Sequence, residues 1–319
     1  NVEITLVENL TVTTSLENSG TINCGTFSIN SGKITNNTNG KISLTSGTIS
    51  VSGEVTNAGT ITCGAGALVV EGDYSGSGKL TLSSATSTFK GGTVDFSDTE
   101  LIHNGGTIIF AKEPSGSYGE VALTVNDTVF NNVQIGTNDK TVKITVDGNF
   151  TVAGNFSASN PNRFSQQQTS SYKGITFSGT GKNISFLGKN TIDQIQVTGT
   201  DNTINFASDN TITTKLNVSG AGNIITFASE NTIKNLSVTA NSNELIFSEN
   251  NTIGTLNLNG ESIVAKFGAG KTQTITNLTA TGTSGKEILL TTDSENPSVN
   301  DNSTWWKIST LTSANTNID

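Results

Sequence analysis

Apolar residues in the second half of the chain recur with a period close to twenty. Phenylalanines mark this repeat at intervals of 20, 21, 20 and 20 residues, and they are Phe186, Phe206, Phe227, Phe247 and Phe267. Each is followed by an NTI phrase or a degenerate copy of it, and then by an apolar pair such as Leu236 and Val238. Because alternate residues of a strand point to the same face, each repeat predicts three short strands: an I-x-F strand, a T-I strand and an L-x-V strand.

A fixed period of about twenty residues with alternating apolar pairs is typical of a solenoid of strands. Each strand would pair in parallel with its equivalent in the next coil, and the phenylalanines would form a core column. The one extra residue of the second repeat falls at Thr213 to Lys215, between strands, where a corner can absorb it. We therefore expect an all-β fold, a single-stranded parallel β-helix with three short strands per coil. The competing fold, an antiparallel sandwich of hairpins, gives no reason for the shared phase of the repeats.

The first half of the chain follows the same rule with different residues. Glycines recur at intervals of 20, 19 and 19, at Gly20, Gly40, Gly59 and Gly78, and an apolar residue follows each one two positions later, at Ile22, Ile42, Ile61 and Leu80. The period is blurred after residue 86, and the stretch 157–173 breaks it. We expect an N-terminal β-helix segment at 1–156, a protruding loop or junction at 157–173, and a regular segment at 174–319 that continues beyond this sequence.

Composition supports a solenoid and excludes some partners. Hydrophobic residues make up 33% of the chain and aromatic residues 6%, which is lean for one large central core. The formal charge is −9 and Arg163 is the only arginine, so nucleic acid is not an expected partner. No apolar run approaches the length of a membrane span, and no sustained helical pattern is present.

Several phrases of the chain resemble the repeat regions of large bacterial surface and secreted proteins. They include "SGTIN", "NGKISLTSGTISVSG" and "FGAGKTQTITNLTATGTSGKEILL". The chain looks like part of an autotransporter passenger or a filamentous-haemagglutinin-like adhesin, whose solenoids are right-handed parallel β-helices. The resemblance implies a right-handed coil, a bacterial source, and a secreted or cell-surface location. It assigns no functional residue.

The recurring asparagine of the NTI phrase stands at a predicted corner. Its amide could bond to the equivalent amide of the neighbouring coil, which would make a ladder of Asn190, Asn210, Asn231 and Asn251. A glycan-binding role is the lesser interpretation, because stacking would use up the hydrogen-bonding groups.

The threonine that follows each asparagine should point outward. Thr191, Thr211, Thr232 and Thr252 would form one exposed file, and with Trp306 they are the outward candidates for ligand binding. Ice binding needs two regular threonine files, but the second file would hold Asp193, Thr213, Lys234 and Gly254. A solvated surface is therefore the default. An outward Trp306 ring could stack on a sugar or pack under a neighbouring loop.

The remaining candidates have plain structural interpretations. Cys24 and Cys63 share one inward column two coils apart, beyond the reach of a disulfide, so we expect free buried thiols. Asp95, Asp98, Glu100 and His103 are close in sequence and could mark an enzyme site, but a polar corner explains them as well. Asp209 and Glu230 could share a calcium ion, yet no calcium-binding repeat is present. We expect no cofactor, no metal site and no catalytic residues.

These observations favour a non-catalytic, extracellular β-helical stalk or adhesin fragment that gives rigid extension and multivalent surface contact. Its partners would be a host-surface glycan, a matrix protein or copies of itself. The alternatives are a carbohydrate-active β-helix enzyme, a lyase or a hydrolase, and a self-assembling matrix or surface-layer component.

Overall fold

The computed structural model describes residues 2–113, 119–137, 142–158, 169–292 and 307–316. These residues form strands and turns without a helix, and the pairings between their strands are parallel, so the chain is an all-β solenoid. It divides into two compact units, the first within residues 2–153 and the second within 154–158 and 169–316.

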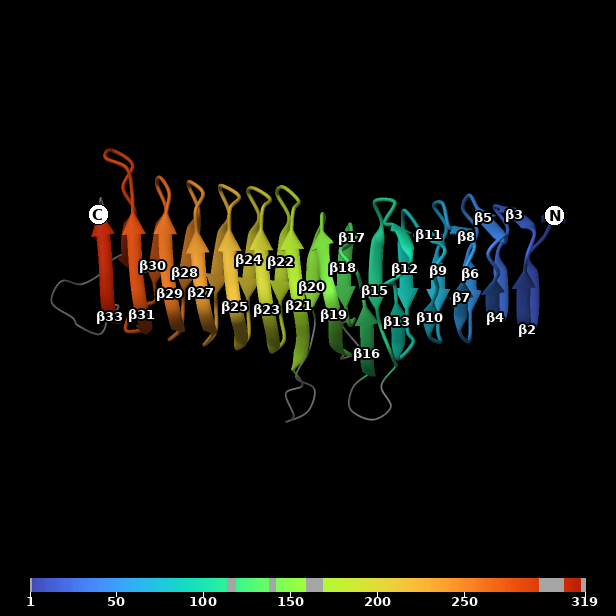
Figure 1. The fold of residues 1–319 in the computed structure, drawn as a ribbon, viewed down its shortest axis with the longest axis horizontal. Coiled ribbons are helices and arrows are strands. Elements are labelled where there is room, and N and C mark those ends of the chain that lie inside the picture. The colour runs from blue at the N-terminus through green and yellow to red at the C-terminus, as the bar shows by residue number, and fades with distance from the viewer. Residues whose placement is uncertain (1, 114–118, 138–141, 159–168, 293–306, 317–319) are drawn as a thin grey trace. The chain divides into compact units, whose positions relative to one another are not determined.

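The first unit has three stacks of strands, one for each side of the coil (Figure 1). The first stack is β1 (Glu3–Thr5), β3 (Thr21–Gly25), β5 (Lys41–Leu44), β8 (Thr60–Thr62), β11 (Lys79–Thr81) and β14 (Glu100–Ile102). The second is β2 (Leu10–Asn18), β4 (Ile29–Asn36), β6 (Ile49–Val51), β9 (Leu68–Val70), β12 (Thr86–Phe89), β15 (Thr107–Phe110) and β18 (Asn132–Ile135). The third stack begins with the C-terminal halves of β2 and β4. It continues through β7 (Val55–Asn57), β10 (Tyr74–Ser75), β13 (Thr93–Asp95), β16 (Gly119–Thr124) and β19 (Val142–Val152). The short strand β17 (Thr128–Phe130) pairs with the last residues of β19.

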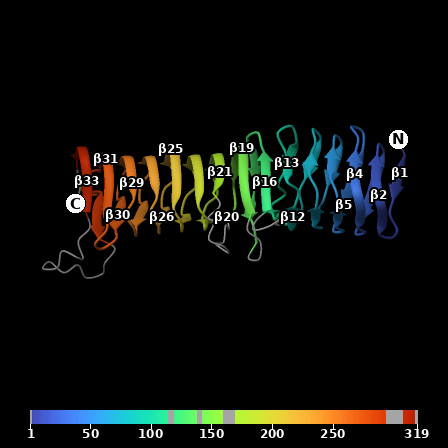
Figure 2. The same cartoon turned by 90° about the horizontal axis from the view of Figure 1, so that it is seen from below.

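The second unit has two stacks, which Figure 2 shows from another side. The I-x-F stack consists of β20 (Phe156–Ala158), β22 (Asn183–Phe186), β24 (Thr203–Phe206), β26 (Ile224–Phe227), β28 (Glu244–Phe247), β30 (Val264–Phe267) and β32 (Leu289–Thr292). The NTI stack consists of β21 (Ser170–Phe177), β23 (Asn190–Val197), β25 (Asn210–Val218), β27 (Thr232–Val238), β29 (Thr252–Asn259), β31 (Thr272–Thr281) and β33 (Lys307–Thr316).

In the NTI stack the T-I and L-x-V segments belong to one strand, where the sequence predicts two. The pairings β21–β23, β27–β29 and β29–β31 run through the corner in register, and only the pairings of β25 pass through a shift of register there, so the backbone turns the corner without leaving the ladder. The extra residue at Thr213 to Lys215 falls at this shift: Ile192 pairs with Ile212 before it, and Ile195 pairs with Leu216 after it. The corner therefore absorbs the insertion, as the repeat predicts.

The core of the second unit is built around the column of phenylalanines. Their rings are fully buried, and neighbouring centroids lie 4.9 to 5.4 Å apart with interplanar angles of 3 to 8°. Isolated aromatic pairs favour offset or edge-to-face contacts, but identical residues at one register position are displaced by one strand spacing and stack in parallel.

Glycines mark corners where successive coils approach too closely for a side chain. A Cβ atom on Gly59 would lie 2.2 Å from the carbonyl oxygen of Gly40, and one on Gly78 would lie 2.1 Å from that of Gly59. The regular glycines of the first half therefore have a steric cause.

The predicted loop at 157–173 lies only partly within the described residues. Ser157 and Ala158 belong to β20, and residues 170–173 belong to β21. Residues 159–168 lie outside the described part of the chain.

Candidate functional site

The four asparagines of the NTI phrase form a hydrogen-bonded ladder inside the second unit. The Nδ2 of each donates to the Oδ1 of the next, at 2.8 Å from Asn190 to Asn210 and at 3.2 Å along the two following steps, from Asn210 to Asn231 and from Asn231 to Asn251. Each Nδ2 also donates to the carbonyl oxygen two residues before it. All four side chains are buried. Both amide hydrogens are thus used within the protein, which leaves no donor for a ligand.

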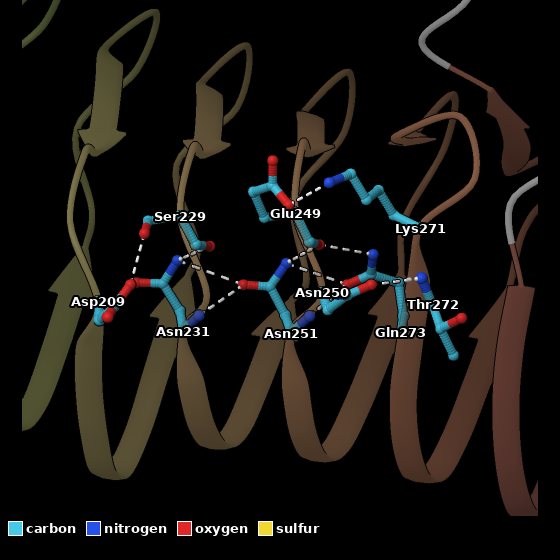
Figure 3. Close-up of polar contacts among 9 residues, drawn as sticks. All are labelled: Asp209, Ser229, Asn231, Glu249, Asn250, Asn251, Lys271, Thr272 and Gln273. Atoms are coloured by element: carbon cyan, nitrogen blue, oxygen red, sulfur yellow. Dashed lines mark hydrogen bonds and ion pairs between the residues drawn. The ribbon is translucent and has the colours of Figure 1, made fainter.

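A glutamine takes the place of asparagine at the last step of this ladder (Figure 3). The Oε1 of Gln273 accepts from the backbone nitrogen of Asn251 at 3.2 Å and from its Nδ2 at 3.0 Å, and Gln273 Nε2 donates to the carbonyl oxygen of Glu249 at 2.9 Å. The repeated NTI phrase does not predict a role for Gln273. Its signal is the KTQTI phrase, which stands where the other coils have NTI.

Side chains around the ladder join the same coils at the surface. The hydroxyl group of Ser229 donates to the carboxylate of Asp209, Lys271 forms an ion pair with Glu249, and the backbone nitrogen of Thr272 donates to Asn250 Oδ1 at 2.8 Å (Figure 3). The Asp209 carboxylate therefore has a partner in the next coil, at the corner that the sequence offered for calcium. Among the described residues, no group of three or more His, Cys, Asp or Glu could hold a metal ion.

Two further asparagine ladders are present that the sequence pattern did not predict. In the first unit, Asn18 donates to Asn36 at 2.9 Å, and Asn36 donates to Asn57 at 2.8 Å. In the second unit, the ladder Asn202, Asn223 and Asn243 has side-chain steps of 3.0 and 3.2 Å. All six side chains are buried. Their spacings of 18 to 21 residues are visible in the sequence. Asn202 begins a further NTI triplet, and Asn18 and Asn57 stand directly before the recurring glycines, in NSGTI and NAGTI.

The threonines of the NTI phrase lie in one outward file. Thr191, Thr211, Thr232 and Thr252 are consecutive register partners, and Thr274 extends the file by one coil. Their side chains are half-buried at the first two positions and exposed at the others. Hydroxyl groups at about 4.8 Å spacing make a flat polar surface. Trp306, the other outward candidate, lies outside the described residues.

Asp95, Glu100 and the histidine each bond to a different partner. The Asp95 carboxylate accepts from the backbone nitrogen of Ser97 at 2.9 Å and from its hydroxyl at 2.7 Å. Glu100 forms an ion pair with Lys79 at 2.6 Å, and the Nδ1 of His103 accepts from the backbone nitrogen of Gly105 at 3.0 Å. The bonds of Asp95 and His103 lie within local turns, and that of Glu100 joins two coils.

The two cysteines are free and buried in the first unit. Burial raises the pKa of Cys24 to about 11. Burial and, to a smaller degree, the neighbouring Cys24 raise the pKa of Cys63 to about 12. Neutral thiols of this kind are poor nucleophiles and poor metal ligands, so both residues serve as small apolar core residues.

Two hollows in the surface of the first unit each contain one carboxylate. One adjoins β1 and is lined by residues that include Val2, Ile4 and Glu17. The other lies over β13, β16 and β19, where the small residues Gly92 and Ala122 leave room beside the Lys143–Glu120 ion pair of 3.1 Å. Glycoside hydrolysis requires a pair of carboxylates across the scissile bond, which neither lining provides.

Comparison with known proteins adds no relative. No protein-family model matches the sequence, and neither the curated proteins nor the solved structures compared with it gave a match. In the described residues, no helix has the length and apolar character needed to cross a membrane.

Proposed function

We propose that the chain is a non-catalytic, rigid β-helical segment of a larger bacterial surface or secreted protein, of the autotransporter-passenger or filamentous-haemagglutinin-like type. In this role it acts outside the cell as a stalk and offers an adhesive surface along its coils. The resemblance of its repeat phrases to those proteins supports the location and the parent protein.

The observation that carries the stalk role is the locking of each coil to its neighbours. Seven ion pairs in the described part of the chain all join residues 19 to 25 positions apart, which is one coil. The three asparagine ladders join the same coils from inside. Each exposed ion pair contributes little to stability, about 0 to 1 kcal/mol. Repeated at many coils, however, such contacts restrain bending and sliding between neighbours.

The surface supports weak contact over an extended area better than one deep binding site. None of the aromatic side chains that the structure describes is fully exposed, and all of them except the half-buried Phe27 are buried. The outward positions of the NTI stack carry mainly Thr, Ser, Asn and Gln, which are hydrogen-bonding groups in regular files. Multivalent binding to a repetitive glycan or matrix surface fits this arrangement.

Rigidity is tested by a distance measurement within the second unit. Ser171 and Thr274 lie in the threonine file five coil steps apart, which corresponds to about 24 Å at the usual strand spacing. Spin labels on cysteines introduced at these two positions should give one narrow distance distribution in a pulsed dipolar measurement, because the native thiols are buried and stay unlabelled. The urea-unfolded labelled chain is the control, and a folded-state distribution equally broad would refute a stalk.

The adhesive part of the proposal has a separate readout. The chain should be retained on glycan or matrix-protein arrays, and the double variant Thr211→Lys, Thr232→Lys should reduce retention on the array that binds. The double variant Asn183→Lys, Thr203→Lys is the matched control, because these two exposed residues are register partners on the outward side of the I-x-F stack. Absence of retention on all arrays would remove adhesion and leave the spacing role.

A further inference from the structure

The outward side of the I-x-F stack changes character along the second unit. On β22 and β24 its outward positions hold Asn183, Ser185, Thr203 and Asn205. From β26 to β32 the same two files hold Ile224, Ile246, Val264 and Leu289, together with Thr226, Glu244, Lys266 and Thr291. Ile224 is 40% exposed and Leu289 is 39% exposed. The inward residues of β26 are buried, and those of β32 are half-buried.

The apolar members of this surface are neighbours. Val264 and Leu289 are direct register partners on β30 and β32. On the adjacent strand β28, Glu244 pairs with Val264 and Ile246 pairs with Lys266. Ile246 is therefore the diagonal neighbour of Val264. Single exposed apolar residues are common on protein surfaces, but contiguous ones mark an interaction surface. We call Ile224, Glu244, Ile246, Val264, Lys266 and Leu289 the β28–β30 patch.

The charges of the patch are arranged so that the patch is complementary to itself. Four residues of β28 and β30 form a quadrilateral, with Glu244 and Lys266 on one diagonal and Ile246 and Val264 on the other. The carboxylate and the ammonium group lie 2.6 Å apart and are partly exposed. A twofold axis along the Ile246–Val264 diagonal would place Glu244 opposite Lys266 of a second copy, and Lys266 opposite Glu244 of that copy. Ile246 and Val264 would each meet their own equivalents.

We propose that the β28–β30 patch binds a second copy of this chain through a twofold contact in which the two ion pairs exchange partners. An isologous interface requires a patch that complements itself, and this one does so in both charge and apolarity. It is also locally neutral on a chain whose net charge is −9, so copies can approach here with less repulsion than elsewhere. The patch covers four short strands, which is small for a permanent interface, and the dimer is therefore weak. This inference does not depend on the stalk role.

The test uses the full chain in sedimentation equilibrium over a range of concentrations. The unmodified chain should show a monomer–dimer equilibrium. Glu244→Lys and Lys266→Glu should each weaken self-association at least about tenfold, because each places like charges opposite one another. An equimolar mixture of the two variants should associate again, since one copy then carries two cations and the other two anions.

Glutamate substitutions inside and outside the patch test whether association depends on the patch itself. Val264→Glu should weaken association, whereas Thr203→Glu, in the same outward file of the polar half, should leave it unchanged. All variants change outward residues, and their thermal unfolding should show that they remain folded. The proposal is wrong if the chain is monomeric at every concentration, if Val264→Glu and Thr203→Glu act alike, or if mixing the charge variants restores nothing.

Discussion

At the scale of single residues, the asparagine ladder depends on the short reach of the amide. The Nδ2 group of each ladder asparagine donates to a carbonyl oxygen two residues back and to the next ladder residue, and its Oδ1 accepts from the coil before. Few side chains offer two donors and an acceptor at this distance from the backbone. The repeated asparagine thus satisfies the buried polar groups of the corner.

Asn231→Ala tests this role. The substitution leaves the backbone nitrogen of Asn210, which donates to Asn231 Oδ1 at 3.0 Å, without its partner in a buried place. The free energy of unfolding should fall by about 1 to 3 kcal/mol, as measured in urea. Asn257→Ala is the control, because Asn257 faces outward and its one bond, to Ser237 Oγ, is long at 3.3 Å; its cost should stay below about 0.5 kcal/mol. Equal costs for the two variants would contradict a ladder that supports the fold.

The buried thiol of Cys63 makes stability depend on alkaline pH. In the unfolded chain its pKa is near 9.0, and in the folded chain it is about 12. Below pH 9 the thiol is protonated in both states, so its contribution to the free energy of unfolding does not depend on pH. Between about pH 9 and 12 the unfolded chain binds fewer protons, so the free energy of unfolding should fall by about 1.4 kcal/mol per pH unit from this group.

The measurement compares the chain with its Cys63→Val variant in urea at pH 8, 9 and 10. Other groups titrate in both proteins and cancel in the difference. The stability difference between the two should move in favour of the variant as pH rises. A difference that does not change with pH would show that the thiol is not buried as described.

At the scale of elements, the NTI strands show how a corner can lie inside a strand. The paired segments on either side keep strict register, whereas β25 has one residue more between its segments than the neighbouring strands have. Length changes are therefore tolerated at the shift and nowhere within the segments, because a one-residue slip there would turn every inward side chain outward.

Deletion of Thr214 tests this division. It shortens the coil by one residue at the shift and removes only exposed contacts, a bond to Asp193 and a carbonyl acceptor for Asn235. We expect a loss of at most about 1 kcal/mol. Deletion of Asn205, between the buried Ile204 and Phe206, should cost more than about 4 kcal/mol or prevent folding. Chemical unfolding of both deletion variants, followed by circular dichroism, measures the difference, and similar losses would refute the assignment of the corner.

At the scale of the molecule, both units are stacks of parallel strands, but their core residues differ. The second unit stacks one column of phenylalanines, whereas the first unit packs Tyr74, Phe89 and Phe96 edge to face or tilted. Identical aromatic rings at one register position stack in parallel, whereas rings from different register positions meet edge to face or tilted. The first unit therefore has no single recurring aromatic residue in its sequence, and its period is carried by the glycines instead.

The solenoid and its inward columns follow from the amino-acid sequence alone. Period and alternation are local properties, so they suffice to predict the parallel register of Ile192 with Ile212 and of Phe206 with Phe227. Other features depend on how the coils dock on one another, and they emerge only in the three-dimensional fold. These include the joining of two segments into one strand, the place of Gln273 in the ladder and the contact of Val264 with Leu289. Residues from different coils become neighbours only when the stack forms, and the repeated phrases alone do not identify these residues as partners.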